Sequence, residues 1–125
     1  MKTTRISTKT VPFELIARRL KAMADPSRLA VLYGLCDGEK CVTELMHATN
    51  LSQTNVSRHL RILKDESLVV ARRNHRHVFY RLSSRVPEEI CTLICKSIRE
   101  RTTGERRLLD RYLGRRHSQR TGSEP

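Results

Sequence analysis

The chain has 125 residues, which is enough for one domain with a modest hydrophobic core. Lys and Arg number 25 against 13 Asp and Glu, giving a formal net charge of +12, and such an excess favours a polyanionic partner such as nucleic acid. The sequence contains no apolar run of about 18 residues, which excludes a transmembrane helix, and its polar start, MKTTRISTKT, is not a secretory signal. We therefore expect no membrane partner and a cytoplasmic location, where thiols stay reduced.

Two helices are predicted in the first third of the chain, after a flexible N-terminus at residues 1–10. From Pro12 onwards apolar residues recur at intervals of three and four, which indicates an amphipathic helix. Asp25-Pro26 starts a second helix, because Asp caps helix N-termini and Pro fits the first helical position. This second helix is predicted to end near Asp37-Gly38. The apolar positions of the two helices are Phe13, Ile16, Ala17, Leu20 and Met23, then Leu29, Leu32, Tyr33 and Cys36.

The next segment predicts a helix-turn-helix. A short helix around Leu45 ends at Thr49-Asn50, and Ser52 caps a fourth helix. The stretch from residue 51 to 64 contains no acidic residue, whereas solvated helices usually mix charges. Amides and guanidinium groups suit base edges in the major groove. The candidate DNA-binding residues of this helix are Ser52, Gln53, Thr54, Asn55, Ser57, Arg58, His59 and Arg61, with Val56, Leu60 and Leu63 facing the core.

A β-hairpin follows, with strands predicted over residues 68–71 and 77–82. The polar turn between them, residues 72–76, is rich in arginine. A basic hairpin beside a reading helix suits phosphate or minor-groove contact. The candidate DNA-binding wing residues are Arg72, Arg73, Asn74, His75, Arg76 and His77.

A fifth helix is predicted to open at Pro87, with Glu88 and Glu89 near its positive end. Its apolar positions are Ile90, Leu93, Ile94 and Ile98, and after an interruption near Gly104 an apolar pattern continues to Leu113. After Gly114 the composition becomes polar, so residues 115–125 are predicted to be a disordered basic tail. The sequence therefore predicts one domain at residues 11–114, mainly α-helical with a small β-hairpin: a winged helix-turn-helix.

Other classes of protein fit the sequence less well. An enzyme is disfavoured, because there is no phosphate-binding glycine loop, no HExxH and no nucleophile elbow. No organic cofactor and no small organic substrate are expected. A general basic winged-helix module, binding RNA or protein without an effector, stays open. It would lack the preference for one palindromic site over bulk duplex DNA that a repressor shows.

Five blocks of the sequence together resemble the ArsR/SmtB family of bacterial winged-helix repressors, which sense metals, metalloids or thiol oxidants. The similarity covers about residues 12–98 and implies four helices, a hairpin and a fifth helix. It also implies a homodimer built on the first and last of these helices. Repression of operator palindromes in double-stranded DNA, with release by an effector, is a further implication. The blocks are Asp25-Pro26-Ser27-Arg28-Leu29, Cys41-Val42-Thr43-Glu44-Leu45, Leu51-Ser52-Gln53, Val56-Ser57-Arg58-His59-Leu60 and Val78-Phe79-Tyr80-Arg81-Leu82.

The cysteines are the candidate sensor. Cys41 matches the first position of the arsenic-sensing Cys-x-Cys pair of the family, but Thr43 stands at the second. The Asp and His ligands of zinc-sensing relatives are absent from residues 86–98. Cys91 and Cys95 lie four residues apart, so both thiols fall on one helical face, and soft thiolates suit As(III), Cd(II) or Zn(II). We expect Cys41, Cys91 and Cys95 to form a three-thiolate site, with Cys36 as another source of the third thiolate, in one subunit or across the dimer.

Two alternatives for the cysteines stay open. Peroxide or persulfide could link two of them and shift the dimer geometry. The cysteines could also be small apolar residues that only pack, since free Cys is often a buried hydrophobe.

Overall fold

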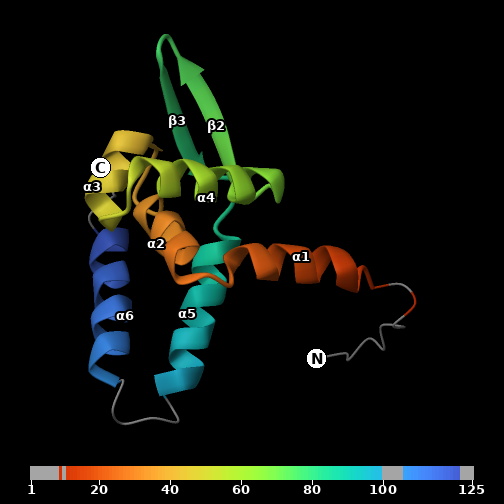
Figure 1. Cartoon of the computed structure of the whole chain (residues 1–125). Coiled ribbons are helices and arrows are strands. Elements are labelled where there is room, and N and C mark those ends of the chain that lie inside the picture. Colours follow the sequence, from red (N-terminus) through yellow and green to blue (C-terminus); the bar gives the residue numbers. More distant parts are fainter. Residues whose placement is uncertain (1–8, 10, 100–105, 122–125) are drawn as a thin grey trace.

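The structure, a computed structural model, describes residue 9 and residues 11–99 and 106–121. The chain forms six helices and a three-stranded sheet within these residues (Figure 1). The elements are α1 (Phe13–Met23), α2 (Pro26–Gly34), β1 (Lys40–Cys41), α3 (Val42–Thr49), α4 (Gln53–Asp65), β2 (Val69–Asn74), β3 (His77–Leu82), α5 (Val86–Arg99) and α6 (Arg106–Thr121). The mainly helical fold with a small antiparallel sheet agrees with the sequence prediction.

The hydrophobic core lies where α2, α3 and α4 pack together next to the base of the hairpin. The predicted core stripe of α4 is confirmed, because Val56, Leu60 and Leu63 are all at most 1% exposed. Burying side chains of this size contributes about 1.5–3 kcal/mol each. The buried apolar residues are Ala22, Met23, Val31, Leu32, Leu35, Leu45, Val56, Leu60, Leu63, Leu68 and Val69.

Local capping groups fix where the helices of the helix-turn-helix begin and end. The Asp25 carboxylate accepts the Arg28 backbone N–H at 3.0 Å and so caps α2. Ser52 Oγ accepts the Asn55 N–H at 3.2 Å and caps α4. Asn50 ends α3 in the left-handed conformation, at φ 58°, which Asn tolerates better than most residues. Asn50 and Ser52 set the turn that places α4 against α3, and Asp25 sets the start of α2.

The sheet has the strand order β1-β3-β2 and is antiparallel throughout. The predicted turn at residues 72–76 is too long, because β2 pairs with β3 as far as Asn74 opposite His77, leaving a two-residue tip. His75, at this tip, has φ 57°. The strand β1 was not predicted; its two residues pair with Tyr80 and Phe79 of β3, and a strand so short carries no periodic signal.

Three other sequence predictions differ from the structure. The second helix ends at Gly34 and continues only as turns, earlier than the predicted end near Asp37-Gly38. The apolar pattern after Gly104 belongs to a separate helix, α6. The predicted disordered tail is wrong for residues 115–121, which continue α6 as far as Thr121; these residues include no proline and mostly tolerate a helix. Residues 122–125, and the predicted flexible N-terminus apart from residue 9, lie outside the described part.

The long helices leave the core in different directions. In Figure 1 α1 projects from the body, α5 and α6 run side by side beneath it, and the β2–β3 hairpin extends from the opposite side. Within the described residues, none of the helices is both long enough and apolar enough to cross a membrane.

Candidate functional site

The outer face of α4 carries polar and basic side chains and no acidic one until Asp65. Its core stripe faces inward, and most of its polar and basic positions point to solvent. Arg58 is held along the helix by a hydrogen bond from its guanidinium to Asn55 Oδ1 at 3.1 Å. This contact aligns an amide and a guanidinium on one exposed helix, the groups that read adenine and guanine in the major groove. Among the predicted residues the exposed ones are Ser52, Gln53, Thr54, Ser57, Arg58 and Arg61, and Asn55 is half-buried.

His59 does not belong to this surface, although the sequence predicts it among the DNA-contacting residues. Its side chain is only 6% exposed, and its Nδ1 atom is buried without a hydrogen-bond partner. Burial lowers the pKa of His59, Asp25 opposes this shift, and Arg28 and Arg58 add to it. His59 is therefore a neutral core residue that lies near the N-terminus of α2.

The wing is basic at its tip and anchored at its base. Arg73, Arg76 and the histidines at positions 75 and 77 are exposed. Arg72 differs, because its guanidinium donates to both carboxylate oxygens of Glu39 at 3.1 and 2.6 Å. It also lies over the ring of Phe79, 5.2 Å from the centroid. A phosphate would have to compete with Glu39 for Arg72, so this residue braces the wing, and the exposed basic side chains of residues 73–77 lie nearer its tip.

The outer face of α4 and the wing lie on the same side of the molecule. Figure 1 shows the hairpin rising directly beside α4, away from α5 and α6, and α4 leads into β2 through Ser67 at φ 59°. A helix for the major groove and a basic ribbon beside it form the arrangement of winged helix-turn-helix DNA-binding domains.

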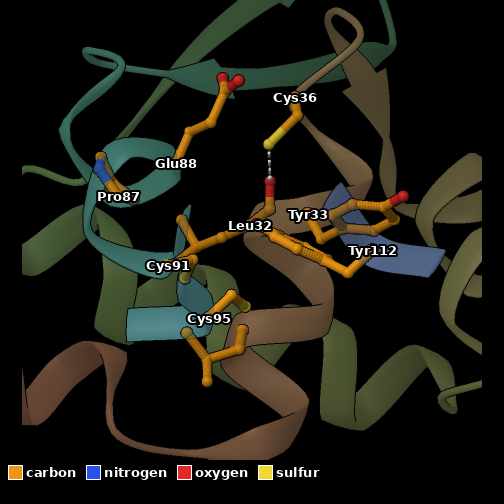
Figure 2. Close-up of a pocket in the computed structure, with 9 residues that line it drawn as sticks. Leu32, Tyr33, Cys36, Pro87, Glu88, Cys91, Cys95 and Tyr112 are labelled. Carbon is orange, nitrogen blue, oxygen red and sulfur yellow. Dashed lines mark hydrogen bonds between the residues drawn. The ribbon is translucent and has the colours of Figure 1, made fainter. Parts of the chain in front are cut away.

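A second feature is an apolar cavity of about 200 Å³ between α2, α5 and α6, which we call the thiol pocket (Figure 2). Three of the four cysteines line it, one from the turn that follows α2 and two from α5. The rings of Tyr33 and Tyr112 close one wall with centroids 5.5 Å apart. The sequence reveals nothing of this wall, because Tyr112 comes from α6, far along the chain. The lining residues are Leu29, Leu32, Tyr33, Cys36, Pro87, Glu88, Cys91, Cys95 and Tyr112.

Burial favours the protonated form of the two α5 thiols, because it raises their pKa values. Burial raises the pKa of Cys91, and the neighbouring Cys95 and Cys36 raise it further. Burial also raises the pKa of Cys95. The Cys36 thiol donates to the backbone oxygen of Leu32 at 3.3 Å (Figure 2). Cys91 and Cys95 are therefore less nucleophilic than exposed thiols.

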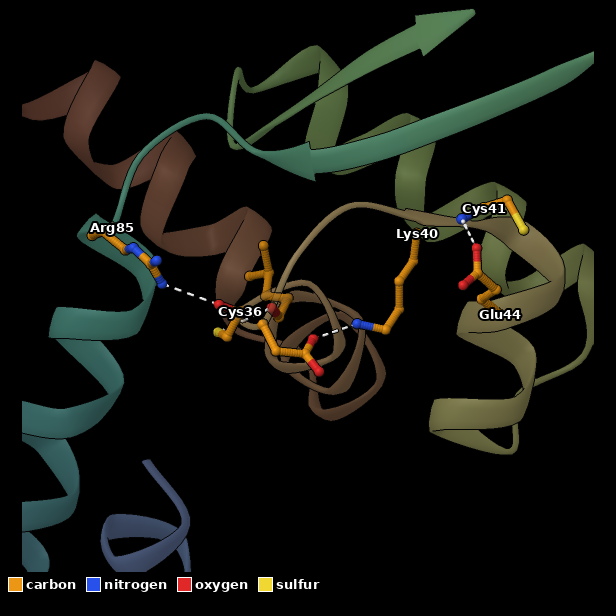
Figure 3. Close-up of polar contacts among 7 residues, drawn as sticks. Cys36, Lys40, Cys41, Glu44 and Arg85 are labelled. Atoms are coloured by element: carbon orange, nitrogen blue, oxygen red, sulfur yellow. Dashed lines mark hydrogen bonds and ion pairs between the residues drawn. The ribbon is translucent and has the colours of Figure 1, made fainter. Parts of the chain in front are cut away.

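Arg85, which the sequence did not single out, joins the two elements that carry the thiols. Its guanidinium donates to the backbone oxygen of Cys36 at 3.0 Å (Figure 3) and to Glu88 Oε2 at 2.8 Å. Glu88 is therefore buried as one half of an ion pair, with its side chain 4% exposed. Arg85 connects the end of α2 to the first turn of α5.

Cys41 lies apart from the other three cysteines of the chain. It is the N-cap of α3, where its backbone N–H donates to Glu44 Oε1 at 3.2 Å (Figure 3), and it does not line the thiol pocket. Within the described residues no three His, Cys, Asp or Glu side chains are placed to hold a metal ion. One chain therefore does not bring Cys41 together with Cys91 and Cys95, and a site across a dimer stays a prediction.

Comparison with known proteins gives a consistent result. The family profile described as bacterial regulatory protein, arsR family, matches residues 25–70. The HTH-type transcriptional repressor SmtB of Mycobacterium tuberculosis is 42% identical over 64 residues, 51% of this chain and 47% of that protein, so the match spans about half of its length. The arsenical resistance operon repressor of Bacillus subtilis is 30% identical over 95 residues, 71% of this chain and 90% of that protein.

The fold has a solved counterpart. Mb0332 from Mycobacterium bovis, described as a homodimeric winged helix-turn-helix DNA-binding domain, superposes with a TM-score of 0.67 at 27% identity, over 79% of this chain and 95% of that one. The family and these relatives are transcriptional regulators and not enzymes. With its winged helix-turn-helix fold and these matches, the chain belongs to the ArsR/SmtB family of bacterial regulatory proteins.

Proposed function

We propose that the protein is a transcriptional repressor of the cytoplasm that binds operator DNA as a homodimer. The observation that carries the proposal is the acid-free outer face of α4 beside the basic tip of the wing. In this arrangement α4 enters the major groove, and Arg73 and Arg76 contact phosphates or the minor groove.

The homodimer is supported by apolar side chains that the single chain leaves in solvent. On α1 four of them are between 45% and 58% exposed, and on α5 Leu93 and Ile94 are 65% and 54% exposed. Clusters of this kind on two helices mark an interaction surface. A two-fold dimer places its two reading helices about 34 Å apart, one turn of DNA.

Fluorescence anisotropy tests this assignment. It measures the binding of duplex DNA that carries candidate palindromes, at several salt concentrations. Arg58→Ala and Gln53→Ala are expected to lose about 1–3 kcal/mol of discrimination between bases. Arg73→Ala should weaken all duplexes alike and reduce the salt dependence by about one phosphate contact. Arg99→Ala removes the same charge from α5, where Arg99 pairs with Asp110, and should leave binding unchanged. Normal operator binding by Arg58→Ala would contradict the placement of α4.

The effector is proposed to act on the cysteines, with a soft metal or metalloid such as As(III), Cd(II) or Zn(II) as the first candidate. Thiolates prefer such ions, and the Bacillus subtilis relative carries arsenical resistance in its name. Titration of the reduced protein with arsenite and with cadmium, without oxygen, tests this candidate. Near-ultraviolet absorption of the thiolates monitors the binding. A saturable signal that disappears in the Cys91→Ser/Cys95→Ser variant is expected, and a signal that persists there contradicts it.

Thiol oxidation is the second candidate, favoured because thiols from α5 and from the turn after α2 line one pocket. One thiolate attacks a peroxide, releasing water or an alcohol and forming a sulfenic acid. A second thiol then displaces water, so that the two sulfurs are oxidised to a disulfide while the peroxide is reduced. Mass spectrometry after peroxide or persulfide treatment tests this candidate through a reproducible crosslink between Cys36 and Cys91 or Cys95.

A further inference from the structure

We infer that the basic end of α6, residues 111–121, is a second DNA-binding element that contacts the phosphate backbone outside the palindrome. The inference rests on the proposed function, because it enlarges the surface with which the same protein binds its operator. The ligand of this element is the sugar-phosphate backbone of duplex DNA, irrespective of base sequence.

The basic end of α6 has an unbalanced positive charge. Residues 111–121 contain four arginines, one histidine and no acidic residue. The one acidic residue in the sequence of α6, Asp110, is paired with Arg99 of α5 at 3.0 Å. A helix dipole places only about half a negative charge at a C-terminus, so it balances little of this excess. A polyanion such as DNA supplies the missing countercharge.

The composition of the basic end gives it little to gain from packing. Residues 115–121 include no apolar residue, so this part of α6 lacks the stripe with which a surface helix packs against a core. Arg111 and Arg115 are four residues apart, and so are Arg116 and Arg120. Like charges at this spacing destabilise a helix. Bound phosphates would relieve this repulsion and stabilise the last turns of α6.

The direction of α6 brings its basic end towards the helix-turn-helix. Asp110 is paired with Arg99, near the end of α5. Tyr112 lies beside Thr92, in the middle of α5, and its ring contacts that of Tyr33 near the C-terminal end of α2. The helix then continues from residue 112 to residue 121, a length of about 13 Å. In Figure 1 this last part of α6 points towards α3, on the side of the molecule that holds α4.

The same geometry places α6 on the outer side of the proposed dimer. Thr92 and Arg99 share the face of α5 that lies against α6. The exposed Leu93 and Ile94 lie on other sides of the helix, because each residue turns it by about 100°. In the proposed dimer the partner subunit covers Leu93 and Ile94. The basic end of α6 therefore lies nearer to the DNA that flanks the palindrome than to its centre.

Fluorescence anisotropy with two duplexes tests the inference. One duplex carries the best-binding candidate palindrome alone, and the other adds about ten base pairs, one turn of DNA, at each end. The unaltered full-length protein is expected to bind the longer duplex at least threefold more tightly. The salt dependence should also be steeper, because more phosphates are neutralised. Arg115→Ala/Arg116→Ala should abolish this gain and bind the shorter duplex as before.

The first turn of α6 offers a matched control, because it holds another pair of neighbouring arginines. Arg106→Ala/Arg107→Ala removes the same charge from the end that points away from α4 (Figure 1) and should keep the gain. Arg115→Lys/Arg116→Lys retains the charge and should keep the gain as well. Alanine favours a helix, and circular dichroism checks that each variant is folded. Equal losses in the two alanine variants, or a loss in the lysine variant, overturn the inference.

Hydroxyl-radical footprinting on the longer duplex locates the contact. The unaltered protein should protect the backbone beyond both ends of the palindrome, and Arg115→Ala/Arg116→Ala should lose only this outer protection. Outer protection that persists in the alanine variant contradicts the inference. A loss of affinity of the same size on both duplexes also contradicts it, because the contact would then lie inside the palindrome.

The shorter duplex separates this inference from the proposed function. If the unaltered protein binds the palindrome without any gain from the flanking DNA, the proposed function stands and the inference fails. If it binds neither duplex, the proposed function fails and the inference fails with it. Tighter binding of the longer duplex that depends on Arg115 and Arg116 supports both.

Discussion

At the scale of single residues, His59 shows how a polar residue type can mislead. A histidine on a helix rich in arginine resembles a DNA contact, yet its place in the core is encoded by spacing. It lies three residues after Val56 and four before Leu63, which are both fully buried, so all three share one face of α4. The spacing alone predicts that His59 is buried, whereas its residue type suggests a DNA contact.

The buried histidine makes stability depend on pH. The folded pKa of His59 lies below its ordinary value of 6.5, so between the two values the unfolded chain binds more protons than the folded one. The free energy of unfolding should therefore fall as the pH drops below about 6.5. His59→Gln is expected to flatten this slope in thermal melts taken from pH 7.5 to 5. The control His47→Gln, at an exposed position of α3, should keep it, and an unchanged slope in His59→Gln would refute the explanation.

Glu39 is predicted to restrain the positive charge of the wing. Its ion pair with Arg72 holds the pKa of Glu39 below the usual range, chiefly through the side-chain hydrogen bond. Glu39→Gln should release Arg72 towards phosphate and steepen the salt dependence of DNA binding by about one counterion. Glu89→Gln removes an exposed acid from α5 and serves as the matched control. Equal salt slopes for the two variants would show that Arg72 stays at the base of the wing.

At the scale of elements, the sequence predicts those with a strong local signal. Asp25-Pro26 and Ser52 start α2 and α4 as expected, because their capping chemistry is local. The end of α2, the strand β1 and the separate helix α6 were missed, since each depends on contacts with distant parts of the chain. The thiol pocket belongs to this group, because it needs α2, α5 and α6 together.

The turn between α3 and α4 should be sensitive to the residue at position 50. Asn50 has φ 58°, a conformation that costs residues with a Cβ about 1–2 kcal/mol but is available to Gly. Asn50→Ala should destabilise the protein by about 1 kcal/mol and Asn50→Gly should be neutral or stabilising, as measured by urea unfolding. The reverse order would mean that the Asn50 side chain, and not its backbone, stabilises the turn.

At the scale of the whole molecule, exposed apolar residues on α1 and α5 link folding to assembly. Ile16→Glu combined with Ile94→Glu places charges on both helices and should give a monomer in analytical ultracentrifugation. Its affinity for a palindrome should fall at least tenfold, because the two half-sites are then bound independently. Thr43→Glu adds a charge at an exposed position of α3 and should stay dimeric. A dimeric double variant would place the interface elsewhere.

The short strand β1 has a consequence for the entropy of DNA recognition. A basic hairpin attached only through its own two strands would sample many orientations and would lose that freedom on meeting a phosphate. The pairing of Lys40 and Cys41 with Tyr80 and Phe79 fixes the base of the hairpin against the start of α3. This ordering is complete before any DNA arrives. The wing is thus preorganised, and only the residues at its tip lose conformational freedom when they bind DNA.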